Sequence, residues 1–209
     1  MSVTENITEA IKKGSKKEIE KYVPQAFDEG VSLCEIMNAL VVGMDDVGKR
    51  FKAGEIFVPE VLVASRAMNA AMAVLDPKLK EAGIKPDHKV VLGTVQGDLH
   101  DIGKNLVGMM LKGANFEVID LGTDVTPEKF VEASKEHNAD ICALSALLTT
   151  TMPSMNDTVK AIRSAGLKTK VIIGGAPVTQ EFCDEIQADG YAPDAASAVD
   201  VARELVKMK

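Results

Sequence analysis

A histidine and two aspartates stand close together near the middle of the chain, in the run Asp98-Leu99-His100-Asp101. Histidine is the commonest metal-binding side chain, and a carboxylate that accepts a hydrogen bond from one ring nitrogen leaves the other free to coordinate. Asp98 could bind Nδ1 of His100 and leave Nε2 for a metal. A surface histidine beside a helix-capping aspartate is the alternative. The neighbouring elements decide what these side chains can do.

Short apolar runs alternate with helical patterns around this histidine. We predict strands at 89–93, 117–121, 141–145, 171–174 and 190–192. Between and after them we predict helices near 102–113, 127–137, 153–165, 178–187 and 195–208. This alternation gives right-handed βαβ units and a parallel sheet covered on both faces. We therefore expect a five-stranded Rossmann-like (flavodoxin-like) α/β domain over 86–209, with ligands bound beyond the carboxyl ends of the strands, where His100 lies.

The N-terminal part has a different period. Apolar residues recur at three- and four-residue spacings in four segments, near 4–13, 16–29, 33–51 and 57–81. Short connections between such segments are typical of a small bundle. We predict an all-α four-helix bundle over 1–85, followed by a linker.

Composition excludes several classes of function. The net charge is −7 and the basic residues are scattered, so a nucleic-acid partner is not expected. The sequence has no apolar run long enough to span a membrane and no secretory signal pattern, which favours the cytoplasm and no membrane partner. Three distant cysteines argue against a disulfide framework or a zinc site. The glycines at 93, 97 and 103 lack the spacing of a dinucleotide-binding loop.

The run from Asp98 to Gly103 resembles the D-x-H-x-x-G motif of corrinoid-binding domains. Those domains occur in cobalamin-dependent methionine synthase, corrinoid methyl carriers and adenosylcobalamin mutases. Two further elements of that family follow in order, Ser145-Ala146-Leu147 for S-x-L and Gly174-Gly175 after the fourth strand. The resemblance implies a cobalamin or related corrinoid cofactor, whose own base is displaced while His100 becomes the lower ligand of cobalt.

The resemblance also implies a ligand triad and a set of cofactor contacts. Asp98 would accept a hydrogen bond from His100 and a hydroxyl residue would follow, namely Thr151 by its spacing from Ser145, with Thr149 and Thr150 as alternatives. The implied contacts are Gly93, Gly97, Asp98, Leu99, His100, Asp101, Ile102, Gly103, Ser145, Leu147, Thr149, Gly174 and Gly175. For the glycines, close packing of helices on the sheet is an alternative explanation.

The stretch 47–59 resembles the helical cap of methionine synthase and the methyl carriers. That match implies that Phe51 and Val58 lie over the methyl face of the corrin, with Val61 one turn further on. Packing in the helical core is the alternative for Val61.

The combined resemblance implies a methyl carrier that is not catalytic alone. It would receive a methyl group from a substrate:corrinoid methyltransferase of the methylamine, quaternary amine or methanol type. A second methyltransferase would pass that group to coenzyme M or tetrahydrofolate, and a reductive activase is a further expected partner. A cobalamin-sensing regulator and a corrinoid storage protein are the alternatives.

Overall fold

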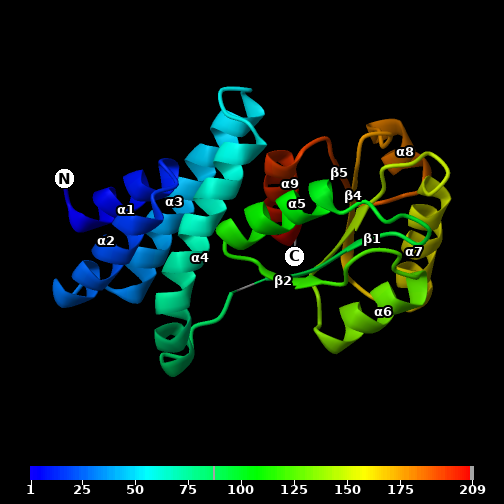
Figure 1. Ribbon diagram of the computed structural model, residues 1–209. Coiled ribbons are helices and arrows are strands. Elements are labelled where there is room, and N and C mark those ends of the chain that lie inside the picture. Colours follow the sequence, from blue (N-terminus) through cyan, green and yellow to red (C-terminus); the bar gives the residue numbers. More distant parts are fainter. Residues whose placement is uncertain (87, 208–209) are drawn as a thin grey trace. The chain divides into compact units, whose positions relative to one another are not determined.

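The computed structural model describes residues 1–86 and 88–207. The chain divides into two compact units, shown in Figure 1. The first unit comprises Met1–Pro86 together with Gly113–Asn115, and the second comprises the described part of Asp87–Lys112 and Phe116–Lys209.

The first unit is helical, as predicted. Its helices are α1 (Val3–Lys12), α2 (Lys16–Asp28), α3 (Leu33–Lys52) and α4 (Val58–Glu81). Serine side chains define three of the helix starts, because Ser2, Ser15 and Ser32 each accept a hydrogen bond from the backbone N–H three residues on. Helix α1 packs against the other three helices, and α4 packs against α2 and α3. The predicted four-helix part is confirmed.

Helix α4 is long and apolar enough to cross a bilayer by length and composition alone. Its small and apolar residues are buried along one side, among them Val61, Ala64, Met68 and Leu75. This burial and the contacts with α1, α2 and α3 are those of a core helix in a bundle.

The second unit is an α/β domain with five parallel strands. Its elements are β1 (Lys89–Thr94), α5 (Ile102–Gly113), β2 (Glu117–Asp120), α6 (Pro127–Glu136), β3 (Ile141–Ser145), α7 (Met152–Ser164), β4 (Lys170–Gly174), α8 (Gln180–Glu185), β5 (Gly190–Ala192) and α9 (Ala195–Lys207). The strand order β2-β1-β3-β4-β5 is the flavodoxin-like order. The predicted fold class is confirmed. Helix α8 is shorter than the predicted 178–187, because Thr179 caps its start and Gln187 turns to a φ of 58°.

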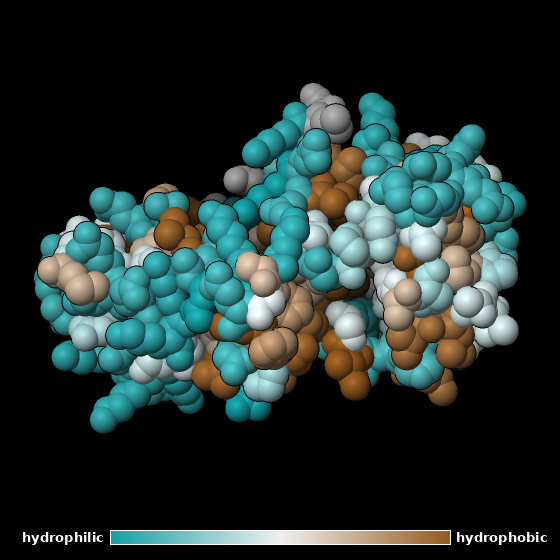
Figure 2. Space-filling model, turned by 90° about the horizontal axis from the view of Figure 1, so that it is seen from above, coloured by the Kyte–Doolittle hydropathy of each residue, from teal (hydrophilic) through white to brown (hydrophobic). Residues whose placement is uncertain are grey.

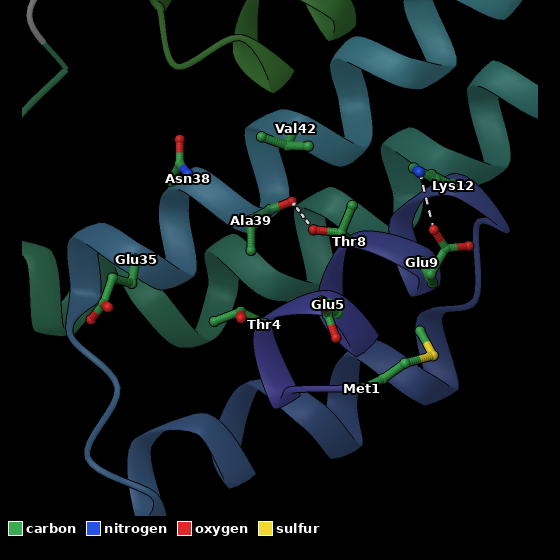
Figure 3. A pocket seen from close by; sticks show the side chains of 10 residues that line it. All are labelled: Met1, Thr4, Glu5, Thr8, Glu9, Lys12, Glu35, Asn38, Ala39 and Val42. Carbon is green, nitrogen blue, oxygen red and sulfur yellow. Dashed lines mark hydrogen bonds and ion pairs between the residues drawn. The ribbon is translucent and has the colours of Figure 1, made fainter.

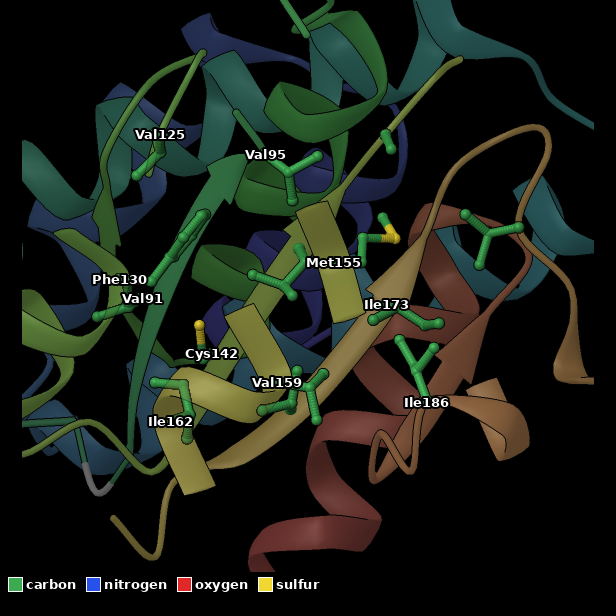
Figure 4. Close-up of a cluster of buried hydrophobic side chains, with 14 of the residues drawn as sticks. Val91, Val95, Val125, Phe130, Cys142, Met155, Val159, Ile162, Ile173 and Ile186 are labelled. Atoms are coloured by element: carbon green, nitrogen blue, oxygen red, sulfur yellow. The ribbon is translucent and has the colours of Figure 1, made fainter. Parts of the chain in front are cut away.

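Successive residues of a strand point to opposite faces of the sheet, and helices pack on both faces. Figure 4 shows one face, where Phe130 of α6 and Met155 of α7 lie in a cluster with Val91 and Cys142 of the sheet. On the other face, Gly108 of α5 packs closely on Leu92. Burial raises the pKa of the Cys142 thiol to about 12, so this cysteine is a structural thiol.

The strand order also determines where a ligand can bind. Strands β1 and β3 are neighbours, and Thr94 pairs with Ser145 at their carboxyl ends. From β1 the chain continues to β2 on one side of the sheet, whereas from β3 it continues to β4 on the other side. Ligands of such sheets bind at this point, where the strand order reverses. The loop after β1 (residues 95–101) and the loop after β3 (residues 146–151) therefore begin side by side.

Candidate functional site

Asp98 lies at the centre of the hydrogen bonds that join these two loops. Its side chain is fully buried. The Oδ1 atom accepts from the backbone N–H of His100 at 3.0 Å and pairs with its ring Nδ1 at 2.7 Å. The Oδ2 atom accepts from the backbone N–H groups of Leu147 at 2.8 Å and Leu148 at 3.4 Å, and from the Thr151 hydroxyl at 2.8 Å. The structure thus links Asp98, His100 and Thr151 in one hydrogen-bonded chain.

These hydrogen bonds determine the charge of Asp98. Burial by itself would raise the pKa of this carboxyl group. The backbone N–H groups of Leu147 and His100, then the His100 ring and the Thr151 hydroxyl, outweigh burial and hold the pKa of Asp98 well below its usual range. Asp98 is therefore ionised at any ordinary pH, and the proton of the pair resides on the imidazole.

The His100 ring is oriented from one side and open on the other. The buried Thr94 hydroxyl donates to the His100 carbonyl oxygen at 2.8 Å, which fixes the backbone, while Asp98 holds Nδ1. The side chain of His100 is nevertheless 52% exposed, and Nε2 has no hydrogen bond within the described part of the chain. A ring held at Nδ1 with a free Nε2 is prepared to coordinate a metal.

Apolar side chains surround this ring. Leu99 is 74% exposed and Ile102 80%, and on the neighbouring loop Leu147 and Leu148 are exposed as well. Among the described residues of the α/β unit, these four are all of the exposed large apolar side chains. Such a gathering of exposed apolar side chains at one end of the sheet indicates a surface for an apolar ligand. On the face shown in Figure 2, hydrophobic patches lie among hydrophilic residues. Leu148 was not predicted from the sequence.

The predicted glycines differ in what surrounds them. A Cβ on Gly93 would lie 2.8 Å from the Phe130 ring, and one on Gly174 would lie 2.8 Å from the Ala192 carbonyl oxygen. Gly175 has a φ of 135°, and its Cβ would lie 1.8 Å from the Ala146 carbonyl oxygen. Backbone atoms of the chain itself therefore exclude a side chain at Gly174 and Gly175, whereas at Gly93 the neighbour is the side chain of Phe130.

Gly97 and Gly103 have no such crowding. Gly97 needs its positive φ of 85° for the turn before Asp98, and a Cβ there would make only an ordinary contact with Thr151. Gly103 lies in the first turn of α5, is exposed, and would have nothing within 4 Å of an added Cβ. Within the described residues no contact explains this helical glycine, and the close approach of a ligand stays a prediction.

The remaining predicted residues of the α/β unit lie in these same loops. Ser145 is partly buried at the end of β3, and Asp101, Thr149 and Thr150 are exposed. Of the three threonines, Thr151 is the one hydrogen-bonded to Asp98. Although it precedes α7, its hydroxyl makes no cap hydrogen bond.

The predicted residues of the helical unit differ in exposure. Phe51 is partly buried, Val58 is 37% exposed and Val61 is fully buried. Complete burial agrees with the alternative explanation of Val61 as a core residue. A contact of Phe51 or Val58 with the cofactor stays a prediction.

Three polar contacts of the site were missed from the sequence. They are the Thr94 hydroxyl on His100, Asp124 on the segment before His100, and a pair between Lys104 and Asp120. Lys104 is only 3% exposed and donates to Asp120 Oδ1 at 2.7 Å, tying the start of α5 to the end of β2. The helical period of α5 places Lys104 on the side that faces the sheet, and this was the one indication in the sequence of a buried charge pair. The other two contacts depend on loop conformation.

A hollow of about 630 Å³ lies elsewhere, between α1 and α3. Figure 3 shows its mixed lining, to which Thr8 and Lys12 of α1 and Glu35 and Val42 of α3 belong. None of the predicted site residues lines it.

Fold and site together define a class of protein. It is a flavodoxin-like domain that presents one oriented imidazole, amid apolar side chains, at the switch point of its sheet. Within the described residues, no group of three or more His, Cys, Asp or Glu side chains could hold a metal ion. A single protein ligand suits a metal that arrives with its other ligands already in place, as in a macrocycle.

Comparisons with known proteins identify the family. Two family models, each described as a B12 binding domain, match residues 88–200 and 3–76. A corrinoid protein of Desulfitobacterium hafniense is 39% identical over 212 residues, covering 99% of this chain and 98% of that protein. Dimethylamine corrinoid protein 1 of Methanosarcina acetivorans is 45% identical over 174 residues, covering 82% of each.

Similar solved structures point to the same family. A cobalamin-binding protein from Desulfitobacterium hafniense matches with a TM-score of 0.81 and 36% identity, covering 97% of this chain and 98% of that one. A chain of the methanol:cobalamin methyltransferase complex from Methanosarcina barkeri matches with a TM-score of 0.89 and 29% identity, covering 99% and 80%. The chain belongs to the B12-binding corrinoid proteins, and its cofactor is a cobalamin or related corrinoid.

Proposed function

We propose that this protein carries a methyl group between two methyltransferases, with Nε2 of His100 as the lower ligand of its corrinoid. The observation that carries the proposal is the His100 ring, which Asp98 holds at Nδ1 while Nε2 stays exposed. When bound, the corrinoid supplies a cobalt ion that can accept and release a methyl group. The protein's residues supply ligation, orientation and a dry surface.

The first role of the site is to fix the tautomer of His100. Asp98 accepts five hydrogen bonds and stays ionised, so Nδ1 carries a proton and Nε2 presents a lone pair. With Nδ1 held by Asp98, Nε2 is the ring atom that would either bind the cobalt or carry a proton. Thr151 contributes by holding the Asp98 carboxylate in place.

The second role is to seat the corrinoid. The exposed Leu99, Ile102 and Leu147 would offer apolar surface to the macrocycle, and burying them would exclude water from the surroundings of the His100 ring. Gly103 allows close approach at the first turn of α5. We propose that the cofactor contacts these residues together with Ser145.

The relatives support the choice of partners in this proposal. The methyl donor we propose is a methylamine, because dimethylamine corrinoid proteins share 43–46% of aligned residues with this chain. Quaternary amines and methanol are the other candidates, since a methanol:cobalamin methyltransferase complex contains a chain of the same fold. The acceptor would be coenzyme M or tetrahydrofolate, a reductive activase would restore the reduced cobalt, and the protein would act in the cytoplasm.

The ligand role of His100 can be tested by electron paramagnetic resonance of the Co(II) form. An axial nitrogen splits the cobalt signal into triplets when it is ¹⁴N and into doublets when it is ¹⁵N. Protein labelled with ¹⁵N-histidine should give doublets, which separates a protein ligand from the corrinoid's own unlabelled base. His100→Ala should lose them, while His137→Ala, a matched control near the end of α6, should keep them. Triplets in the labelled protein would refute His100 as ligand.

The carrier function needs a separate test. The reduced holoprotein is mixed with a methylamine:corrinoid methyltransferase and its substrate, and the visible spectrum is followed. A stoichiometric change to the methylated form, reversed by a coenzyme M or tetrahydrofolate methyltransferase, is the expected result. A sensor or storage protein would bind the corrinoid without either reaction.

A further inference from the structure

We propose that Asp124 is a positioning residue that holds the Gly97–Asp98 segment and so aims the ligand nitrogen of His100; this rests on the function proposed above. Asp124 lies outside the residues that resemblance assigns to the site. It belongs to the loop between β2 and α6 (residues 121–126), next to the loop that carries His100.

Asp124 binds the segment at both ends. Its carboxylate Oδ1 accepts from the backbone N–H of Gly97 at 2.8 Å, and its own backbone N–H donates to the Asp98 carbonyl oxygen at 3.0 Å. Beside it, the backbone N–H of Val125 donates to the Thr94 carbonyl oxygen at 3.0 Å, which keeps the two loops aligned. Asp124 thus holds Gly97 and Asp98, the two residues immediately before Leu99 and His100.

The backbone of Asp124 is in an unfavourable conformation that these contacts require. Its φ is 54°, in the left-handed region that non-glycine residues rarely occupy, although aspartate and asparagine tolerate it better than others. In this conformation the N–H and the side chain of one residue reach the same segment. A strained residue persists where the surrounding structure holds it, and here both of its contacts lie on the proposed ligand loop.

The two neighbouring loops therefore have separate tasks. The loop after β3 holds the carboxylate of Asp98, through Leu147 and Thr151. The loop after β2 holds the backbone of Asp98, through Asp124. The backbone N–H of Asp98 donates to Val95 and the Thr94 hydroxyl holds the His100 carbonyl oxygen, so Asp124 contributes the remaining contacts, at the Gly97 N–H and the Asp98 carbonyl oxygen.

Three variants separate the contribution of the Asp124 side-chain acceptor from that of its backbone conformation. Asp124→Asn keeps an acceptor oxygen and the tolerance for positive φ. Asp124→Gly keeps only the tolerance for positive φ, and Asp124→Ala keeps neither. The full-length chain without cofactor is compared by amide hydrogen exchange at His100 and Leu147, whose N–H groups bind the Asp98 carboxylate. Amides of α7 serve as the internal reference.

We expect exchange at His100 and Leu147 to rise about tenfold in Asp124→Gly and Asp124→Ala, as one lost charge-assisted hydrogen bond predicts, and less than threefold in Asp124→Asn. Exchange within α7 should stay unchanged. After reconstitution with hydroxocobalamin and reduction, the fraction with ¹⁵N-histidine doublets should fall below half in the Gly and Ala variants only.

Unchanged exchange in Asp124→Gly would overturn the proposal, and so would an equal rise in α7, which would indicate general destabilisation. A wild-type protein that lacks the doublets would refute the function proposed for His100. In that case the exchange measurements still decide whether Asp124 positions the loop.

Discussion

The loop after β1 and the loop after β4 both match the corrinoid family, but their residues are required for different reasons. At the first, Asp98 and His100 are fixed by hydrogen bonds, and Gly103 in the first turn of α5 has open space around it. At the second, Gly174 at the end of β4 and Gly175 after it lie against backbone carbonyl groups of the chain itself. The motif residues of the second region are therefore explained by the fold alone, whereas Gly103 is not.

The sharpest test of this difference is Gly175→Ala. The added Cβ would lie 1.8 Å from the Ala146 carbonyl oxygen at a φ of 135°, so backbone must move. We expect a loss of more than about 4 kcal/mol in the free energy of unfolding, measured by urea denaturation, or failure to fold. Gly166→Ala is the matched control, because its φ is 69° but nothing lies within 4 Å, and it should cost about 1–2 kcal/mol. Equal losses would show that crowding at Gly175 is unimportant.

The second largest effect is expected for Asp98→Ala in the loop after β1. Removing the carboxylate leaves buried N–H groups without their acceptor, which should cost about 2–4 kcal/mol. Because the folded pKa of Asp98 is lowered, its contribution is complete above the unfolded pKa of about 4 and is lost as the pH falls further. Urea denaturation between pH 2 and 6 should therefore give a flatter curve for the variant. An equally steep curve would mean that other groups cause the acid sensitivity.

Gly93→Ala tests a glycine whose neighbour can yield. Its Cβ would meet the Phe130 ring at 2.8 Å, and a side chain can shift where a backbone carbonyl cannot. We expect a loss of about 1–3 kcal/mol in the free energy of unfolding. Adding Phe130→Leu should restore part of it, and a double variant whose losses simply add would contradict a direct contact.

Gly103→Ala should have the smallest effect on stability and a clear effect on the ligand. With open space around the helical position, the free energy of unfolding should rise by up to about 1 kcal/mol. Affinity for hydroxocobalamin, measured by equilibrium dialysis, should fall at least tenfold. Unchanged affinity would place the cofactor away from Gly103 and would remove the contrast between the two loops.

The sequence predicted the fold because strand and helix periods are local properties. All five strands were found near their observed positions, since each is a short apolar run between turn residues. Only the strand order needed the structure. It is determined by packing between segments far apart in sequence, and both a Rossmann-like and a flavodoxin-like arrangement fit the pattern.

The site was predictable only in part. Asp98 and His100 are only two residues apart and are of types that bind metals, and a family spacing pointed to Thr151. The contribution of Asp124 was not visible, because it depends on a positive φ and on a contact with a residue 27 positions away. Sequence also left two explanations for the glycines, which differ only in what a Cβ would touch.

The hydrogen bonds that present His100 join distant parts of the chain. Asp98 is 49 residues from Leu147 and 53 from Thr151, so the carboxylate finds its donors only once β1 and β3 lie side by side. A chain that has formed β1 and the loop after it, but not β3, contains His100 without the donors that hold the Asp98 carboxylate. The orientation of His100 is therefore a property of the closed sheet and not of its own loop alone.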